Sequence, residues 1–327
     1  MTPVIPKVST AALLGHEGDE ARHAACADVA TAAAGPGFLA LAGADAALGL
    51  DPQARARLLR FFDLPPAARA ALARAKFRPG APNHYRGVFL PQPGEPTWKE
   101  GIDLGPDLVD PALARPGDPL TEPTPLPPEA EAPGWRAEAA ACHAAMSRLG
   151  LTLVEALAAP FGLDPAETRA LFDGGLSTLR LIRYPERTRE SLPADLAQAQ
   201  VPGEDRWIVG KAHCDNGFVT LLWQDAQGGL QARAADGAWI DVPPLPGGLA
   251  VNFGRMLSDI TGGQVRATEH RVLGGLRERV SIPFFLEPAA DAAIPFADGP
   301  RPYGDVLWER MTRFVEFRGV ARRVAAD

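Results

Sequence analysis

A histidine and an aspartate stand two residues apart, at positions 213 and 215, inside the apolar run RWIVGKAHCDNGFVTLLWQD (206–225). Residues two apart on a β-strand project from the same face. We therefore expect His213 and Asp215 to point to one side and Cys214 to the other. An imidazole and a carboxylate held together are suitable ligands for iron, zinc or manganese. The pair predicts part of a metal site, although such a pair is also common as a plain surface contact.

A metal site of this kind needs a further ligand. The chain has six histidines, at positions 16, 23, 84, 143, 213 and 270, and within the β-rich part His270 is the one other that lies in a strand-like run. Two histidines and one carboxylate leave three positions open on an iron ion, which is the ligand set of non-haem Fe(II) oxygenases. His270 is therefore the predicted third ligand.

The residues after His270 suggest an anion site. Arg279 and Ser281 are again two apart, in the apolar run RVSIPFF (279–285). A buried guanidinium matches a carboxylate in a bidentate pair, and a serine hydroxyl can donate to the same group. If Gly274 and Gly275 formed a two-residue hairpin, His270 would lie opposite Arg279; alternatively, the chain crosses here between two sheets. Either arrangement places the anion site close to the metal.

From about residue 176 to residue 288, short β-prone segments alternate with glycine and proline, and this pattern predicts a series of short strands. The expected strands are 177–185, 206–215, 218–225, 228–233, 238–244, 249–254, 265–273 and 279–288. Eight short strands in just over 100 residues are typical of a sandwich or jelly roll.

Helices are expected mainly earlier in the chain. Alanine-rich or amphipathic patterns predict helices over 19–34, 51–64, 65–75 and 135–159, with a short strand over 37–43. The proline-rich stretch 106–133 predicts an extended surface connection. We expect four regions: a mainly helical region with a substrate loop (1–134), a long supporting helix (135–175), the jelly-roll core (176–288) and a helical extension (289–327).

Composition restricts the partners. The 327 residues carry a formal net charge of −7 with both signs interspersed, so nucleic acid is not an expected partner. No apolar run approaches the roughly 20 residues of a membrane span, and the start lacks the order of a secretion signal. The three cysteines form no CxxC pair, which disfavours a disulfide framework. We expect a cytoplasmic protein without a membrane partner.

Taken together, these segments resemble the isopenicillin N synthase-like Fe(II)/2-oxoglutarate-dependent oxygenases. The resemblance runs nearly end to end: VIPKVST and PGFLALAG are similar to the N-terminal region, residues 85–107 to the substrate loop, and APGWRAE to the start of the long helix. In the core, the similar segments are STLRLIRYP, GKAHCDNGFVTLLWQDAQGGLQ, WIDVPPLPGGLAVNFGRML, ATEHRV and RVSIPFF.

The resemblance implies an α+β fold with a double-stranded β-helix (jelly-roll) core. It implies Fe(II) held by His213, Asp215 and His270. It further implies that Arg279 and Ser281, with Tyr184, bind the distal carboxylate of the co-substrate 2-oxoglutarate. With O2, such an enzyme oxidises a C–H bond by hydroxylation, desaturation or ring formation, and releases succinate and CO2.

The substrate is expected to be a small soluble metabolite, handled by a monomer or weak homo-oligomer. Arg180 shares a strand face with Tyr184 and is the better candidate for a substrate carboxylate, whereas Arg183 faces away. The other candidates for the substrate pocket are Arg86, Ile182, Leu222 and Phe284.

Two other functions stay open at this point. One is an oxidase of the isopenicillin N synthase type, which uses Fe(II) and O2 without 2-oxoglutarate and grips a substrate carboxylate with Arg279 and Ser281. The other is a jelly-roll binding protein that does not turn over, which an intact set of five site residues argues against.

Overall fold

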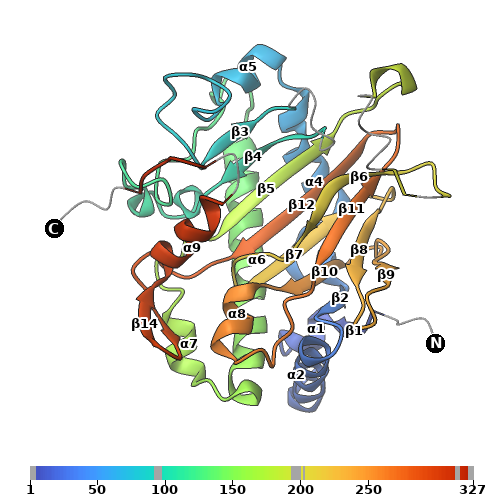
Figure 1. Cartoon of the computed structure of the whole chain (residues 1–327), viewed down its shortest axis with the longest axis vertical. Coiled ribbons are helices and arrows are strands. Elements are labelled where there is room, and N and C mark those ends of the chain that lie inside the picture. Colours follow the sequence, from blue (N-terminus) through green and yellow to red (C-terminus); the bar gives the residue numbers. More distant parts are fainter. Residues whose placement is uncertain (1–4, 92–97, 193–199, 202, 314–316, 323–327) are drawn as a thin grey trace.

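The structure is a computed structural model of the chain, and it describes residues 5–91, 98–192, 200–201, 203–313 and 317–322. Part of the expected substrate loop, residues 92–97, lies outside these ranges. Figure 1 shows a large twisted sheet with helices on one side and a smaller sheet on the other.

The large sheet has eight strands in the order β1-β2-β10-β7-β12-β5-β4-β3. All neighbours are antiparallel except β1 and β2. The strands are β1 (Lys7–Ser9), β2 (Phe38–Ala42), β3 (Gly87–Phe89), β4 (Glu100–Leu104), β5 (Thr178–Tyr184), β7 (Val219–Gln224), β10 (Leu249–Phe253) and β12 (Arg279–Leu286).

The small sheet has four strands in the order β6-β11-β8-β9. They are β6 (Trp207–His213), β8 (Leu230–Arg233), β9 (Trp239–Asp241) and β11 (His270–Gly274). Apolar side chains of both sheets meet between them: Phe38 and Ala250 of the large sheet pack in one cluster with Leu230 and Ile240 of the small one. The expected α+β jelly roll is confirmed.

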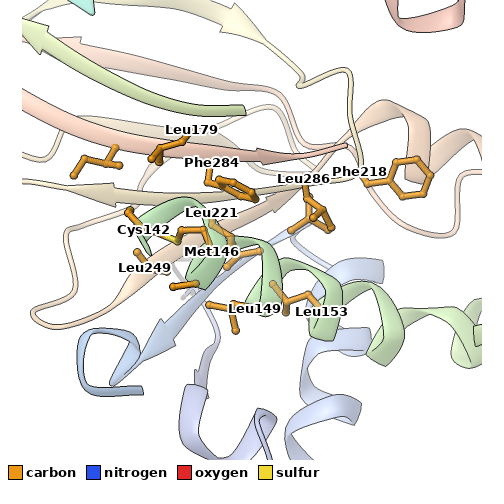
Figure 2. Close-up of a cluster of buried hydrophobic side chains, with 14 of the residues drawn as sticks. Cys142, Met146, Leu149, Leu153, Leu179, Phe218, Leu221, Leu249, Phe284 and Leu286 are labelled. Carbon is orange, nitrogen blue, oxygen red and sulfur yellow. The ribbon is translucent and has the colours of Figure 1, made fainter. Parts of the chain in front are cut away.

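The described α-helices are α1 (Thr10–Leu13), α2 (Asp19–Ala34), α3 (Ala44–Leu48), α4 (Pro52–Leu59), α5 (Pro66–Ala71), α6 (Trp135–Ala158), α7 (Pro165–Ala170), α8 (Arg255–Ile260) and α9 (Tyr303–Met311). The long helix α6 packs on the outer face of the large sheet against β7 and β12, whereas α8 and α9 contact residues 293–302. Figure 2 shows side chains of α6 packing against those of the sheet strands, namely Cys142, Met146, Leu149 and Leu153 against Leu179, Leu221, Phe284 and Leu286.

Helix α6 also bears on the expectation about membranes. Within the described residues, Trp135–Phe161 is long and apolar enough to cross a bilayer by length and composition, so the expectation that no segment reaches this length is wrong. Half of its most apolar window is nevertheless buried inside the protein. This is the pattern of a core helix, in keeping with its packing under the large sheet.

Other expectations need correction. The N-terminal region is less purely helical than predicted, because β1 to β4 join the large sheet. The segment after residue 288, expected to be helical, first forms a hairpin of β13 (Ala293–Phe296) and β14 (Gly299–Pro302). Of the two arrangements left open at Gly274–Gly275, the crossing is confirmed: β11 belongs to the small sheet and β12 to the large one, so the chain crosses between sheets.

Candidate metal centre and co-substrate pocket

His213, Asp215 and His270 converge between the two sheets. Their potential ligand atoms all lie within 4.8 Å of one another. The Nε2 atoms of His213 and His270 lie 3.6 and 3.7 Å from the same Oδ1 atom of Asp215. The expected strand through residue 215 is wrong, because β6 ends at His213 and Asp215 stands in the following loop. The predicted convergence nevertheless occurs, since β11 pairs with β6 and sets His270 opposite His213.

Backbone carbonyls fix the orientation of both imidazoles. Nδ1 of His213 lies 2.8 Å from the carbonyl oxygen of Lys211, and Nδ1 of His270 lies 3.1 Å from that of Thr268. A proton on Nδ1 donates to each carbonyl and leaves the Nε2 lone pair for a metal. The edge of the Phe38 ring packs on His270, with 5.7 Å between ring centroids. Two imidazole nitrogens and a carboxylate oxygen are a donor set that fits Fe(II).

Asp215 is held in its ionised form. Burial favours the neutral acid, but His270 and His213 together with Asn252 outweigh burial and hold its pKa well below the usual range. Its Oδ2 atom accepts hydrogen bonds from the Thr220 hydroxyl at 2.5 Å and from Asn252 Nδ2 at 2.8 Å. Burial also lowers the pKa of His270. A carboxylate with one oxygen fixed by hydrogen bonds is thereby aimed at the metal position.

Arg279 forms the centre of the predicted anion site and is 3% exposed. Its Nε donates to the Gly228 carbonyl at 2.6 Å, one terminal nitrogen donates to Ser281 Oγ at 3.2 Å, and the guanidinium carbon lies 5.0 Å from the Tyr184 ring centroid. Arg279 and Tyr184 are direct partners across β12 and β5, and both line one small cavity with Val209. The structure therefore brings Arg279, Ser281 and Tyr184 together.

Strand register places the anion site next to the metal ligands. On β7, Thr220 supports Asp215 and pairs with Phe285 of β12, while Gln224 pairs with Ser281. Directly paired residues of antiparallel strands present their side chains on the same face. The residues that support the two sites thus occupy one face of the same pair of strands, and Thr220 and Gln224 themselves are about 13 Å apart along β7 at 3.3 Å per residue.

The predicted substrate residues fall into two groups. Arg180, Ile182 and Leu222 lie on the sheet face toward the metal: Ile182 packs with Tyr184 and Val209, and Leu222 packs with apolar residues of the small sheet. Arg180 binds both carboxylate oxygens of Asp103 and lies between the rings of Phe89 and Phe285, 5.4 and 5.3 Å from their centroids.

The two other predicted substrate residues are buried and already have partners within the protein. Phe284 faces α6, is fully buried and packs edge-on against His143, with 5.1 Å between ring centroids. Its prediction as a pocket residue is wrong. Arg86 is 1% exposed and donates to Thr178 and to the Leu176 carbonyl, so its role is to tie the β3 region to β5.

Sequence reasoning missed several residues around the site. Asn252 and Thr220, which hold Asp215, lie on β10 and β7 at positions that pair directly. Phe285, Asp103 and Glu287 also border the face that carries Arg180. Strand parity could have identified Phe285, because positions 279, 281 and 285 share one face, whereas Asp103 could not be identified without the pairing of β4 with β5.

Comparisons with known proteins agree with this geometry. Residues 179–288 match the model of the 2OG-Fe(II) oxygenase superfamily. Gibberellin 20 oxidase 2 of Oryza sativa subsp. indica is 31% identical over 322 residues, covering 95% of this chain and 75% of that protein. The 2-oxoglutarate-dependent dioxygenase citB of Monascus ruber is 30% identical over 300 residues, covering 88% and 85%.

Solved structures show the same fold. A full-length protein of Neurospora crassa, solved in complex with alpha-KG and thymine, superposes with a TM-score of 0.77 at 23% identity, covering 95% of this chain and 97% of that one. A 2OG-Fe(II) oxygenase family protein from Caulobacter crescentus gives a TM-score of 0.73 at 24% identity, covering 95% and 99%.

Proposed function

Because the chain belongs to the 2OG-Fe(II) oxygenase superfamily, we propose that its triad of His213, Asp215 and His270 holds the catalytic Fe(II) ion. The protein is an oxidoreductase of the Fe(II)/2-oxoglutarate-dependent dioxygenase type, with 2-oxoglutarate and O2 as co-substrates. Neither an oxidase that works without 2-oxoglutarate nor a non-catalytic binding protein agrees with these relatives as well.

One observation carries the assignment of the co-substrate site. Arg279, with Ser281 and Tyr184 beside it, stands on the same sheet face as the residues that support the triad. We assign the distal carboxylate of 2-oxoglutarate to Arg279 and Ser281, with Tyr184 beside it as a further donor. A buried guanidinium held by the Gly228 carbonyl is already oriented, so little conformational entropy is lost when the carboxylate binds.

Bound iron supplies the activation of O2 that couples the decarboxylation of 2-oxoglutarate to succinate and CO2 with oxidation of a substrate C–H bond. The protein contributes position and exclusion of water. Thr220 and Asn252 orient Asp215, and His270, His213 and Asn252 keep its carboxylate ionised. Ile182 and Leu222 provide apolar walls on the face toward the metal, which limit the water that reaches the reacting groups.

The substrate is a small molecule, and we propose a metabolite placed between the triad and Arg180. The side chain of Arg180 is 22% exposed and clamped by Asp103, which suits it to orient a polar group of the substrate. The relatives are named for different substrates, and a similar structure holds thymine, a free base, so no single substrate carries over.

A monomer or weak homo-oligomer is proposed, because Val109 is the one large hydrophobic residue exposed among the described positions. A small metabolite in place of nucleic acid agrees with the net charge of −7. Location in the cytoplasm and the absence of a membrane partner stay predictions.

An anaerobic titration of the Fe(II)-loaded protein with 2-oxoglutarate tests the assignment. The wild type should develop the visible charge-transfer band of a chelated 2-oxoglutarate complex, and Arg279→Ala should lose it. Arg183→Ala is the matched control, because Arg183 lies on the same strand as Tyr184 and binds Glu100 away from the site. A band of equal strength in Arg279→Ala would remove the co-substrate assignment.

A further inference from the structure

Glu287 directly follows β12 and continues the alternation of Arg279, Ser281 and Phe285. It is 5% exposed. Its side chain lies against the loop that carries Asp215: a Cβ atom at Gly217 would be 3.2 Å from Glu287 Cγ and 3.4 Å from Oε1. The buried carboxyl of Glu287 therefore stands at the metal end of the sheet face whose other end binds the co-substrate.

Two oxygen atoms at this position are short of hydrogen-bond partners. Within the described ranges, Glu287 Oε2 and the hydroxyl of Tyr303 have no partner that meets both distance and angle criteria. The two groups lie close enough to interact with each other, but the one hydroxyl proton can serve only one carboxyl oxygen. Tyr303 is the first residue of α9 and is fully buried. A buried polar atom without a partner costs about 1–3 kcal/mol, and nearly all such atoms in native proteins are paired. The pair of oxygens thus calls for a ligand that can hydrogen-bond.

The surrounding charges restrict the chemistry of that ligand. Arg86 and Arg180 both lie close enough to lower the pKa of Glu287, but within the described ranges neither forms an ion pair with it. Burial, the larger effect, raises this pKa to about 7. Two guanidinium groups disfavour a cationic ligand, and a carboxyl oxygen disfavours an anion that would face it directly. A neutral N–H or O–H donor suits the position.

We propose that Glu287, together with Tyr303, is a specificity-determining residue that accepts a hydrogen bond from a neutral N–H or O–H group of the substrate, such as an amide, imide or alcohol. The inference rests on the proposed function, because the triad defines where the substrate lies. Phe285 stands two residues before Glu287 on the same face and touches Arg180, so one small substrate can reach both polar residues.

Donor and methylated analogues test this inference directly. The protein is loaded with 2-oxoglutarate and with Zn(II) in place of iron, and binding is followed by ligand-observed NMR. The probes are 2-piperidone against N-methyl-2-piperidone, and cyclohexanol against methoxycyclohexane. The wild type should bind each donor at least about tenfold more tightly than its methylated partner, the effect of one hydrogen bond to a charged or strongly polar group.

The variants separate recognition from folding. Glu287→Gln should reduce the donor preference to about twofold or reverse it, because its amide also donates. Tyr303→Phe should also reduce the preference for the donors over their methylated partners. This variant tests the inference if Glu287→Gln does not fold. Glu100→Gln is the matched control: Glu100 is 6% exposed and binds Arg183 on the other side of the sheet.

The outcomes distinguish this inference from the proposed function. Affinity for 2-oxoglutarate should be the same in the wild type and in Glu287→Gln. If the wild type does not bind 2-oxoglutarate, the proposed co-substrate site is contradicted, but the role of Glu287 is not. Equal binding of the donors and their methylated partners, no binding of either donor, or a preference unchanged in both Glu287→Gln and Tyr303→Phe would overturn the role of Glu287.

Discussion

Asn252 donates a hydrogen bond of 2.8 Å to Oδ2 of Asp215, while the Oδ1 atom of the same carboxylate faces both imidazoles of the triad. The two residues lie 37 positions apart, and the pairing of β10 with β7 brings them together. One oxygen of Asp215 thus serves the protein and the other serves the metal. Hydrogen bonds of this kind orient a ligand before the ion arrives.

Asn252→Ala should therefore weaken Fe(II) binding by about 10- to 100-fold without displacing any ligand. Equilibrium dialysis of the metal under anaerobic conditions measures the change. Asn83→Ala is the control, since Asn83 is also buried and donates to the Pro123 carbonyl at 2.6 Å, far along the chain from the triad. Equal losses of metal affinity in both variants would contradict the role of Asn252.

Gly229 shapes the turn that holds Arg279. Its φ is +90°, and a Cβ atom there would lie 2.0 Å from the Leu273 carbonyl oxygen. Gly229→Ala should cost more than the roughly 1–3 kcal/mol of a strained backbone and should also weaken 2-oxoglutarate binding, because the neighbouring Gly228 carbonyl anchors Arg279. Thermal unfolding and co-substrate titration measure both effects.

Gly237→Ala controls for backbone strain alone. Gly237 has φ +86°, and the nearest atom to an added Cβ is 4.0 Å away. Its substitution should cost stability but leave the affinity for 2-oxoglutarate unchanged. If Gly229→Ala and Gly237→Ala lower the free energy of unfolding equally, the close approach of Gly229 to the Leu273 carbonyl does not add to the cost of the substitution.

Phe284 and Phe285 are adjacent but should respond differently to substitution. Phe284→Ala opens a cavity against α6 and should lower the free energy of unfolding by about 3–5 kcal/mol. Phe285 is half-buried on the metal side, so Phe285→Ala should cost less stability and mainly alter substrate-stimulated turnover. Urea unfolding followed by tryptophan fluorescence compares them. A larger stability loss in Phe285→Ala would reverse this assignment of faces.

His143 should make the fold sensitive to acid. Burial lowers its pKa to about 4 from 6.5. The unfolded chain then takes up the proton first, so the stability from the neutral imidazole is complete above pH 6.5 and is lost as the pH falls toward 4, by up to about 3 kcal/mol. Glu287, whose pKa burial raises to about 7, acts in the opposite direction: its contribution is lost as the pH rises from 4.5 to 7.

Urea unfolding at several pH values between about 4.5 and 7 measures how the free energy of unfolding changes with pH. His143→Gln should remove the part due to His143 and make the stability less sensitive to acid. His16→Gln, at an exposed position, should leave the slope as in the wild type. An identical pH dependence in the wild type and His143→Gln would show that His143 is not the group responsible.

The sequence predicts the triad because two of its ligands are close together along the chain and because the chain contains few histidines from which to choose the third. Two ligands are two residues apart, and six histidines leave His270 as the one other in a strand-like run of the β-rich part. Arg279 and Ser281 are found by the same spacing. These expectations do not depend on knowing which strands pair, so they hold even though β6 ends before Asp215.

The remainder of the site depends on strand pairing. Asp103 meets Arg180 because β4 lies beside β5, and Arg86 reaches Thr178 across 92 positions. Phe284 is expected in the pocket but lies on the opposite face of β12. Strand alternation already indicates this, because Phe284 is an odd number of residues from Arg279 and Ser281. The crossing after Gly274 could not be separated from a hairpin, because two glycines permit both and only the packing of the two sheets decides.

The most direct test of the proposed chemistry is the formation of succinate from 2-oxoglutarate in the presence of Fe(II) and O2. The wild type should release succinate in amounts that depend on added iron. His270→Ala should release at least about 100-fold less, because it lacks a metal ligand, and His16→Ala, exposed and away from the triad, should match the wild type. Equal succinate release by His270→Ala and the wild type would contradict the metal assignment, and O2 uptake by the wild type without succinate would contradict the use of 2-oxoglutarate.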